Sequence, residues 1–440
     1  MKRVAIIAEN SNEYIKTLLK IWDDGDCAVL IDWRIPVNSI MEMLQLAKVE
    51  VCYTDLINLW DLLQSNENVF CCLLKKMSNS VFVENEIYDN FQSRYNDEEA
   101  LILFSSGTTG NAKGVVLSHA AINKNADAIL DYLNLDKDVF FLSKSLSHSS
   151  TIVGELLVGL KSRTPIFLSV SYLSPNVLLK NLALSMATIA FLNPTLLKLL
   201  SNINKTLKVE FPKLKKIYVS GSILNLTMAQ KAKISFPKTT IYNVYGLTEC
   251  GPRVSAQTEL QEELSGSVGK PVKNVKVKIV SPQGKEIGIN KPGIVSVYTP
   301  SLFKYYLGRE SSVNKDEWFN TSDIGLIDEN NNLYILGRYD NTIISSSHNV
   351  CPEEVERIIN EIDGVNDCIV IGIKDELYGE KMICLYEGEE KDKLMLVSKC
   401  KEFLAPYEIP KDFICIDKLF RTNNGKLIRS ADKYKNIFQS

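Results

Sequence analysis

The chain has 440 residues, enough for two or three domains and a large buried core. Apolar residues make up 45% and charged residues 23%, as in ordinary globular proteins, and the net charge of -3 argues against nucleic acid or a membrane as a partner. No apolar run approaches the roughly 18–20 residues of a membrane helix. The ten cysteines form no C-x-x-C pair and only three histidines exist, so we expect free thiols in a reducing, cytoplasmic compartment rather than zinc sites.

Short apolar runs typical of strands alternate with stretches of helical spacing through the first three quarters of the chain. This alternation predicts α/β layers with largely parallel sheets. The expected strands are Val4–Ala8, Cys27–Ile31, Val51–Tyr53, Ala100–Ser105, Pro165–Leu168, Ile189–Leu192, Lys216–Ser220 and Thr240–Tyr245, and the expected helices in the first part are Asn12–Trp22, Val37–Ala47 and Ile57–Leu63.

The pattern changes between about residues 266 and 298. Short strands such as Lys276–Val280 and Gly293–Tyr298 are separated there by turns like Pro282-Gln283-Gly284, which predicts a small antiparallel unit. A second boundary lies near Gly337–Asp340, and the rest of the chain has the pattern of a small domain of helices and strands. The expected elements of that domain are a helix at Pro352–Glu361, strands at Val365–Ile373 and Met382–Tyr386, a helix at Lys393–Leu404 and a strand at Phe413–Ile416.

The sequence therefore predicts an α/β fold in two parts. A large N-terminal domain, residues 1–337, consists of layered α/β subdomains and the small antiparallel β unit. A small, mobile C-terminal α+β domain spans residues 338–440.

The strongest local signal is the segment Ser105–Gly114, which follows the expected strand Leu101–Phe104. Three glycines, four hydroxyl residues and Lys113 lie within ten positions. Glycines let the backbone approach an anion closely, successive N–H groups can form a concave nest, and hydroxyls and a lysine add donors for phosphate oxygens. The alternative is a flexible surface turn. The segment is not a Walker P-loop, because it lacks G-x-x-x-x-G-K-[ST].

A second segment, Tyr245-Gly246-Leu247-Thr248-Glu249, follows the apolar strand Ile241–Val244. An aromatic ring beside a glycine turn can stack on a base, a threonine hydroxyl can bind phosphate, and a glutamate can hold Mg²⁺ together with phosphates. Taken alone, the segment could equally be the end of a strand with an exposed acid.

Three further segments carry polar groups that would be unremarkable singly. Thr321-Ser322-Asp323 contains an acid that could accept ribose hydroxyls, and Gly337-Arg338-Tyr339-Asp340 contains an arginine that could reach ribose or phosphate. Asn424-Gly425-Lys426 places a lysine near the C-terminus, where a lysine is ordinarily solvated. Each alone is more often a turn or a surface ion pair.

Together and in this order, the segments resemble the adenylate-forming superfamily of acyl-CoA synthetases, nonribosomal peptide synthetase adenylation domains and firefly luciferase. The resemblance covers nearly the whole chain, including Val4–Ile7 and Ala28–Asp32 at its start. Within the superfamily, the chain is similar to a compact, stand-alone acyl- or aryl-acid ligase. The resemblance implies that ATP and Mg²⁺ take part and that the C-terminal domain turns between two steps.

The resemblance also implies a role for each matching residue. Thr248 would contact the α-phosphate, Glu249 would bind Mg²⁺, and Lys426 would enter the active site for adenylation. Asp340 would be the hinge of the small domain. The other nucleotide-binding residues would be Ser105, Ser106, Gly107, Thr108, Thr109, Gly110 and Lys113 at the phosphates, Tyr245 and Gly246 at adenine, and Asp323 and Arg338 at ribose.

The acyl pocket is also identified through the resemblance. His148 and Ser149 would line the way to the acyl group, and the pocket wall and floor would be formed by Ser220, Gly221, Ser222, Asn243 and Val244. Adenylation domains that select α-amino acids place an Asp in the segment that matches Leu146–Ile152, and no acid occurs there. We therefore expect a fatty or aryl carboxylic acid. A purely structural role of His148 is the alternative.

Several positions depart from the family pattern. Ala112 stands where proline is usual, and Ser322 replaces the glycine of Thr-Gly-Asp. Ser346 and Ser347 replace two glycines of Ile-Ile-Ser-Gly-Gly, and side chains there would narrow the thiol tunnel. These changes weigh against CoA as the thiol acceptor more than against adenylation. We also expect the family's usual segment before the first strand to be missing.

The function expected from the sequence is ATP-dependent activation of a carboxylic acid to an acyl-adenylate with release of pyrophosphate. Transfer to a thiol would follow, on CoA or on the phosphopantetheine arm of a carrier protein. The alternative is a non-catalytic or adenylation-only binding or regulatory protein on the same fold, and an oxidative, luciferase-like reaction is a further one.

Overall fold

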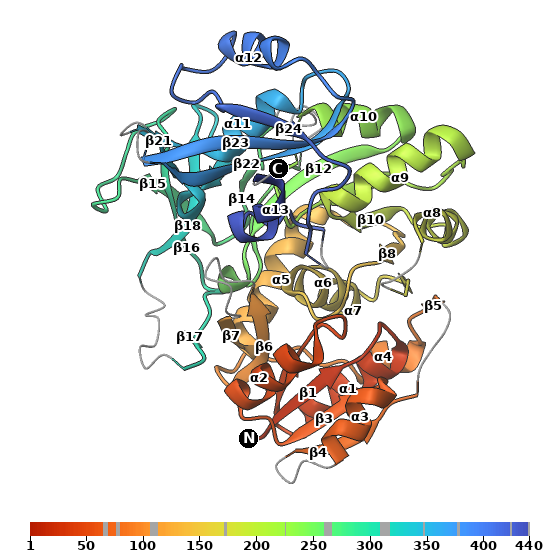
Figure 1. The fold of residues 1–440 in the computed structure, drawn as a ribbon. Helices are drawn as coiled ribbons and strands as arrows, with labels where there is room; N and C mark the ends of the chain where they lie inside the picture. The colour runs from red at the N-terminus through yellow and green to blue at the C-terminus, as the bar shows by residue number, and fades with distance from the viewer. Residues whose placement is uncertain are drawn as a thin grey trace. The chain divides into compact units, whose positions relative to one another are not determined.

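The computed structural model describes residues 1–64, 69–75, 80–105, 113–170, 174–224, 226–258, 266–308, 317–345, 348–375, 379–422 and 425–438 (Figure 1). The chain divides into two compact units. The first comprises Met1–Leu224, Ala229–Val277 and Val297–Phe319, and the second consists chiefly of Lys278–Ser296 and Asn320–Ser440. The boundary between residues 337 and 338 remains a prediction.

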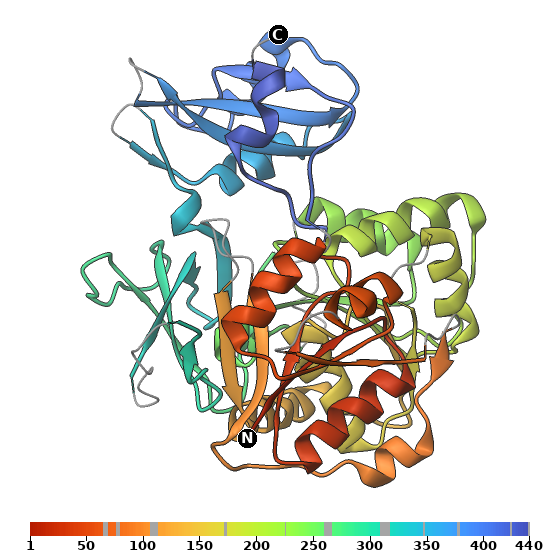
Figure 2. The same ribbon diagram turned by 60° about the horizontal axis from the view of Figure 1, so that its bottom comes forward.

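The first sheet of unit 1 is parallel at its centre. Strand β1 pairs with β2 and β3 in parallel, β2 pairs with β6, and an antiparallel hairpin then adds β7, which lies next to the edge strand. The order across the sheet is β17 (Tyr305–Tyr306), β7 (Lys113–Ser118), β6 (Glu99–Ser105), β2 (Cys27–Leu30), β1 (Arg3–Ile7), β3 (Val51–Thr54) and β4 (Phe70–Leu73). Its neighbouring helices are α1 (Asn12–Asp23), α2 (Val37–Ala47), α3 (Ile57–Gln64) and α4 (Asn85–Asn90) (Figure 2).

Helix α1 shows why this layer forms. Ser11 caps it by accepting a hydrogen bond from the Tyr14 N–H at 3.0 Å, which satisfies one of the backbone donors that a helix start leaves unpaired. Its buried face includes Ile15, Leu18 and Trp22, at the three- and four-residue spacing of one helix side. The Trp22 indole N–H donates to the Ala100 carbonyl at 2.9 Å, which ties the helix to β6.

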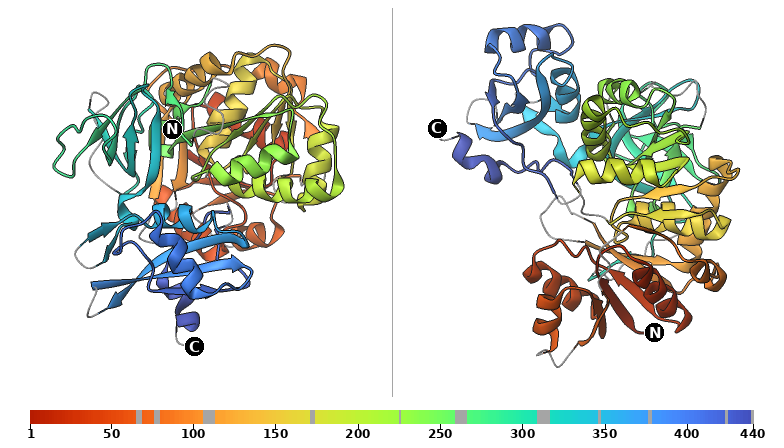
Figure 3. Two further views of the ribbon diagram at one scale, coloured as in Figure 1. Left: turned by 90° about the horizontal axis from the view of Figure 1, so that it is seen from above. Right: turned by 90° about the vertical axis from the view of Figure 1, so that its right-hand side faces the viewer.

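The second sheet of unit 1 is also parallel at its centre. Its order is β14 (Lys270–Pro271), β13 (Arg253–Ala256), β12 (Thr240–Gly246), β11 (Lys216–Val219), β10 (Ile189–Leu192), β8 (Phe140–Leu142), β9 (Ile166–Leu168) and β5 (Val81–Phe82). The pairs from β12 through β9 are parallel, and the outer strands are antiparallel. The helices linked to this sheet are α5 (His119–Leu133), α6 (Ser149–Thr151), the π-helix η1 (Ile152–Leu157), α7 (Val158–Ser162), α8 (Pro175–Leu184), α9 (Pro194–Leu207) and α10 (Leu226–Ser235) (Figure 3).

Two largely antiparallel sheets lie chiefly in unit 2, although residues 276–277, 297–298 and 319 of the first one belong to unit 1. The small sheet has the order β15 (Lys276–Val280), β16 (Gly293–Tyr298), β18 (Phe319–Ile327) and β19 (Leu333–Arg338). The C-terminal sheet has the order β21 (His348–Val350), β20 (Ile343–Ser345), β23 (Gly379–Gly388) and β22 (Val365–Asp375), with β24 (Asp412–Cys415) parallel to β23. Helices α11 (Pro352–Ile359), α12 (Lys393–Lys401) and α13 (Lys435–Phe438) accompany this sheet.

The predicted fold class is confirmed. Parallel α/β layers, the small antiparallel sheet and an α+β C-terminal region all occur where the sequence pattern indicated. The sequence pattern did not indicate the antiparallel strand β7, because its apolar run continues directly into α5. Within the described residues, no helix combines the length and the apolar character that crossing a bilayer requires.

Burial of one histidine makes the stability of unit 1 sensitive to acid. His119, at the start of α5, is 4% exposed and packs edge-on against Trp22 with ring centroids 5.5 Å apart. Burial lowers the pKa of His119 to about 4 from a usual value of 6.5. Between these two pH values, His119 is protonated in the unfolded chain but not in the folded chain. The free energy of unfolding therefore falls as the pH drops through this range.

We predict that His119→Phe removes this sensitivity. Between pH 7 and pH 5, the wild-type protein should lose about 2 kcal/mol more of its free energy of unfolding than the variant does. Urea unfolding of both proteins at the two pH values measures the difference. Equal losses in the two proteins would contradict the assignment.

Candidate functional site

Loops at the carboxyl ends of the two parallel sheets of unit 1 are joined by one asparagine. Asn10, which follows β1, donates through Nδ2 to the carbonyls of Lys144 at 2.9 Å and Ser169 at 3.2 Å, and its Oδ1 accepts from the Leu146 N–H at 2.9 Å. Asn10 is 4% exposed. Ligands of open α/β sheets bind at the carboxyl ends of the strands, so this junction is where a site is expected.

A second link between the sheets involves His148. Its Nε2 lies 3.4 Å from Oδ2 of Asp32, which follows β2, and Arg34 donates through Nε to Asp32 Oδ1 at 2.8 Å. Burial would raise the pKa of the Asp32 carboxyl, but the hydrogen bonds from Arg34 and His148 outweigh it and hold that pKa below its usual value. The aspartate therefore stays ionised and orients the imidazole.

The segment after β12 contacts two other segments of unit 1. Thr248 Oγ1 and Ser149 Oγ are 3.0 Å apart, and the Tyr306 hydroxyl donates to Glu249 Oε1 at 2.9 Å. The Lys113 ammonium lies 5.9 Å from the centre of the Tyr306 ring, within range of a cation–π contact. Three hydroxyls, a carboxylate and an ammonium from distant parts of the chain are thus linked in one connected set.

Gly246 allows the chain to turn tightly at this point. A Cβ added to Gly246 would lie 1.7 Å from the carbonyl oxygen of Pro252, so no other residue fits without moving the backbone. Gly246 pairs with Arg253 across the β12–β13 hairpin, and the register shifts between Tyr245 and Gly246. The close approach holds Tyr245 and Thr248 on either side of a fixed bend.

The residues expected to form the acyl pocket end or follow the middle strands of the second sheet. Asn243 donates through Nδ2 to the Ser267 carbonyl at 3.1 Å, and Val244 is 3% exposed. Ser220 follows β11, and its hydroxyl lies 3.3 Å from the Lys144 ammonium. The remaining two positions, Gly221 and Ser222, lie on the exposed side of the same turn.

Part of the expected phosphate-binding segment lies outside the described residues: Ser106, Gly107, Thr108, Thr109 and Gly110. On either side of it, Ser105 pairs with Lys113 in the β6–β7 hairpin. The two ends of the segment are therefore held next to each other at the carboxyl end of β6.

In unit 2, the expected ribose-binding residues are neighbours. Asp323 on β18 and Arg338 on β19 face each other in register, with Arg338 Nε 4.0 Å from Asp323 Oδ1. Arg338 also lies 3.2 Å from the carboxylate of Asp340, the expected hinge residue. The Asp323 N–H donates to Thr321 Oγ1 at 3.1 Å, which fixes the backbone at the aspartate.

Lys426 is exposed in unit 2, on a turn that is anchored from both sides. Before the turn, Arg421 is ion-paired with Asp367. After the turn, Arg429 is ion-paired with Glu356 and donates to the Val370 carbonyl at 2.6 Å. The lysine therefore lies between two arginines that are anchored to α11 and β22.

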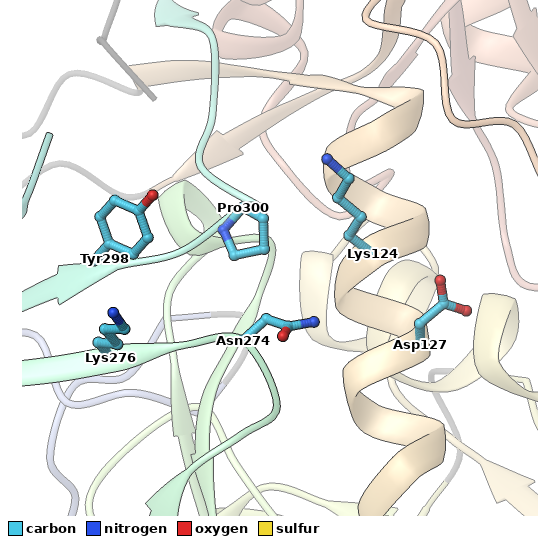
Figure 4. A pocket seen from close by; sticks show the side chains of 6 residues that line it. All are labelled: Lys124, Asp127, Asn274, Lys276, Tyr298 and Pro300. Atoms are coloured by element: carbon cyan, nitrogen blue, oxygen red, sulfur yellow. The ribbon is translucent and has the colours of Figure 1, made fainter. Parts of the chain in front are cut away.

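A separate groove of about 400 Å³ lies elsewhere on unit 1. Figure 4 shows its lining residues, with Lys124 and Asp127 on α5 facing Asn274, Lys276, Tyr298 and Pro300. Lys276 lies over the Tyr298 ring at 5.9 Å. None of these six residues is among those that the sequence led us to expect at a nucleotide-binding, acyl or catalytic position.

Comparison with known families agrees with the order of these segments. The family model described as AMP-binding enzyme matches residues 1–307, and the model of the AMP-binding enzyme C-terminal domain matches residues 354–426. The chain belongs to the AMP-binding enzyme family. The resemblance to adenylate-forming enzymes is therefore confirmed.

Relatives of this AMP-binding enzyme are named as acid–CoA ligases. The 2-succinylbenzoate–CoA ligase of Bacillus licheniformis is 30% identical over 77% of this chain and 70% of its own. The protein named uncharacterized acyl–CoA ligase YhfT of Bacillus subtilis is 26% identical over 98% and 87%. The chain spans about two thirds of several others: 66% of the acyl–CoA ligase YdaB of Bacillus subtilis, 67% of 4-coumarate–CoA ligase 1 of Arabidopsis thaliana and 61% of the long-chain-fatty-acid–CoA ligase of Yersinia pestis.

Solved structures share the fold of this AMP-binding enzyme. ATP-bound MatB from Rhodopseudomonas palustris superposes with a TM-score of 0.87 at 23% identity and covers 99% of this chain and 89% of its own. The o-succinylbenzoate CoA synthetase MenE from Bacillus subtilis, in complex with the acyl-adenylate OSB-AMP, has a TM-score of 0.81 at 22% identity, over 97% and 87%.

Three functional-site residues escaped the sequence analysis of this AMP-binding enzyme. Tyr306 holds Glu249, and Lys144 and Glu155 form a buried ion pair with their charged atoms 2.5 Å apart. Lys144 and Glu155 lie on either side of His148 in the sequence. A charged residue inside an apolar stretch was the signal that could have identified each of them. No local pattern points to Tyr306, because its partner lies far away in the sequence.

The bend at Gly246 supplies a test of this geometry. We predict that Gly246→Ala lowers the free energy of unfolding by about 3 kcal/mol or more, because its Cβ would overlap the Pro252 carbonyl. Gly288→Ala is the matched control, since a Cβ there has no atom within 4 Å and the change should stay below about 0.5 kcal/mol. Chemical unfolding compares the two variants, and equal effects would refute the predicted overlap.

Proposed function

We propose that this AMP-binding enzyme activates a carboxylic acid with ATP, forming an acyl-adenylate and pyrophosphate, and then transfers the acyl group to a thiol. The observation that carries the proposal is the connected set of Thr248, Ser149, Glu249, Tyr306 and Lys113 at the carboxyl ends of the parallel strands. Relatives named as acid–CoA ligases support the reaction class.

The chemistry explains why such a set is needed. A carboxylate attacks the α-phosphorus, a new oxygen–phosphorus bond forms, and the bond to pyrophosphate breaks. Because two anions must approach each other, catalysis depends on positioning and on stabilising negative charge. In this proposal, Thr248 and Lys113 donate to phosphate oxygens, and Tyr245 packs against adenine.

The proposal assigns Mg²⁺ to Glu249. Mg²⁺ prefers oxygen ligands and usually keeps waters and phosphate oxygens beside one or two carboxylates, so a lone glutamate suits it. Glu249 is fixed by the Tyr306 hydroxyl at 2.9 Å through one oxygen, which leaves its second oxygen for the metal. When bound, the ion would offset charge on the leaving pyrophosphate.

In unit 2, Asp323 and Arg338 would hold the ribose hydroxyls, and Asp340 would act as the hinge. Lys426 would stabilise charge on the α-phosphate and then withdraw as its domain turns. Its anchored, exposed turn supports this role, because a lysine that must arrive accurately benefits from a rigid base.

For the thiol acceptor, we propose the phosphopantetheine arm of a carrier protein alongside CoA. Ser346 and Ser347, which lie outside the described residues, would crowd the tunnel that the family's glycines leave open. A non-catalytic binding protein is disfavoured, because it would need none of Glu249, Asp323 and Lys426.

We predict that Lys426→Ala abolishes acyl-adenylate formation while ATP binding is retained. Loss of a cation that acts on the reacting phosphate should slow this step by about a hundredfold or more. Mass spectrometry of the acyl-adenylate measures the step, and calorimetry measures ATP binding. Lys418→Ala, another exposed lysine of the C-terminal domain, is the control. Full activity of Lys426→Ala would refute the role.

For the second step, we predict that Ser346→Gly/Ser347→Gly increases the rate of thioester formation with CoA and leaves acyl-adenylate formation unchanged. The glycines would restore backbone freedom and remove two side chains from the thiol path. Mass detection of the thioester with CoA and with a phosphopantetheinylated carrier protein compares the acceptors. An unchanged rate with CoA would contradict the tunnel argument.

A further inference from the structure

Three charged residues of unit 1, which we call the Lys144 cluster, are buried behind the His148 segment: Lys144, Glu155 and Arg253. The Lys144 side chain is 8% exposed, Glu155 is fully buried and Arg253 is 2% exposed. Burying charged groups is costly and is usually offset by complete pairing. The adenylation chemistry proposed above uses none of the three, so their burial needs another explanation.

The cluster is not completely paired. The Lys144 ammonium lies 2.5 Å from Glu155 Oε1 and 3.3 Å from Ser220 Oγ, yet an ammonium has three donors. No third partner occurs in the described part of the chain. Within the same residues, Arg253 Nε and Glu155 Oε2 are buried and have no hydrogen-bond partner. Buried polar atoms without partners are rare and point to a missing ligand or water.

The cluster also carries excess positive charge. The Arg253 guanidinium lies close to Gly154, the residue that precedes Glu155. Its Nη2 is 3.4 Å from the point where a Cβ would stand if Gly154 carried a side chain. The Lys144 cluster therefore contains two cations and one carboxylate, and of the two cations Lys144 is the one ion-paired with Glu155 in the described residues. Burial raises the pKa of Glu155 above its usual value, although the charges of Lys144 and Arg253 act to lower it. Protonation of Glu155 would increase the net positive charge of the cluster further.

The location of the cluster connects it with the acyl pocket. Lys144 follows β8 and Ser220 follows β11, and β10 lies between these two parallel strands. The Lys144 side chain therefore reaches across the carboxyl end of β10 to a serine expected in the pocket wall. Glu155 fixes the ammonium from the π-helix η1, a rare element that is frequent at functional sites.

Building on the proposed function, we propose that Lys144 is a specificity-determining residue that binds a second carboxylate of the acid substrate, with Ser220 as an additional donor. The enzyme then prefers dicarboxylic acids to monocarboxylic acids with the same carbon skeleton. A second carboxylate accepts the third ammonium hydrogen bond and balances the excess charge. An unsubstituted acyl chain leaves these donors unpaired, which a buried site penalises.

Acid-dependent exchange of pyrophosphate into ATP tests the preference. The probes are three matched pairs of acids: butyrate and succinate, hexanoate and adipate, 4-methylbenzoate and terephthalate. The wild-type enzyme should show a higher kcat/KM for the dicarboxylic acid in at least one pair. Lys144→Met should lower this preference by about tenfold or more, mainly through the KM of the dicarboxylic acid, because a hydrogen bond to a charged group is lost.

Two further variants keep the test decisive if Lys144→Met destabilises the protein. Lys144→Met/Glu155→Gln removes both charges together, so no unpaired carboxylate stays buried, and it should show the same loss of preference. Lys161→Met is the matched control, because its side chain is also 8% exposed and is paired with Asp127 at 2.6 Å but does not contact Ser220. Thermal unfolding establishes that each variant is folded.

The outcomes separate this inference from the proposed function. Exchange that favours the monocarboxylic acid of every pair in the wild type overturns the role of Lys144 and leaves adenylation intact. An unchanged preference in the folded single or double variant does the same. Absence of exchange with every acid contradicts the proposed function itself. Loss of preference in the Lys144 variants, but not in Lys161→Met, supports the inference.

Discussion

The hydrogen bonds of Asn10 are the interaction on which the arrangement of unit 1 depends. They join the loop after the first strand of one parallel sheet to the loop after β8 of the other, so the carboxyl ends of both sheets meet at one place. The Asp32–His148 contact adds a second link along the same junction. Because parallel strands deliver their side chains and loops to a common edge, residues far apart in sequence become neighbours there.

This constraint explains why the sequence was informative about the fold. Apolar runs and helical spacing indicated most of the parallel strands and the first crossover helices, although not β4 or β8. The strand β12 leads into Thr248 and Glu249 as the pattern indicated. Strand β7 was missed because its apolar run continues directly into α5, so no separate pattern marks it as the second strand of a hairpin. The contacts that complete the site were also missed. Tyr306 meets Glu249, and Lys144 meets Ser220, only through tertiary packing, which no local pattern encodes.

The two units divide the proposed chemistry between them. Unit 1 supplies donors for phosphate and the segments of the acyl pocket, and unit 2 supplies Lys426 on a turn fixed by Arg421 and Arg429. The anchoring ion pairs of Arg421 and Arg429 lie within residues 338–440, so they would be kept if this part of the chain turned at Asp340 as proposed. Within unit 1, the Lys144 cluster places unbalanced charge beside the segment of Ser220. The proposed function thus combines an adenylation site with a local feature that would narrow the choice of acid.

The central claim is that the carboxylate of the substrate attacks the α-phosphorus of ATP. The most direct measurement uses an acid that supports exchange, labelled with heavy oxygen in its carboxylate, followed by mass spectrometry of the AMP formed after thioester release. Our account predicts that one labelled oxygen passes from the acid to AMP in each turnover. AMP without label, formed at the same rate as the thioester, would contradict it.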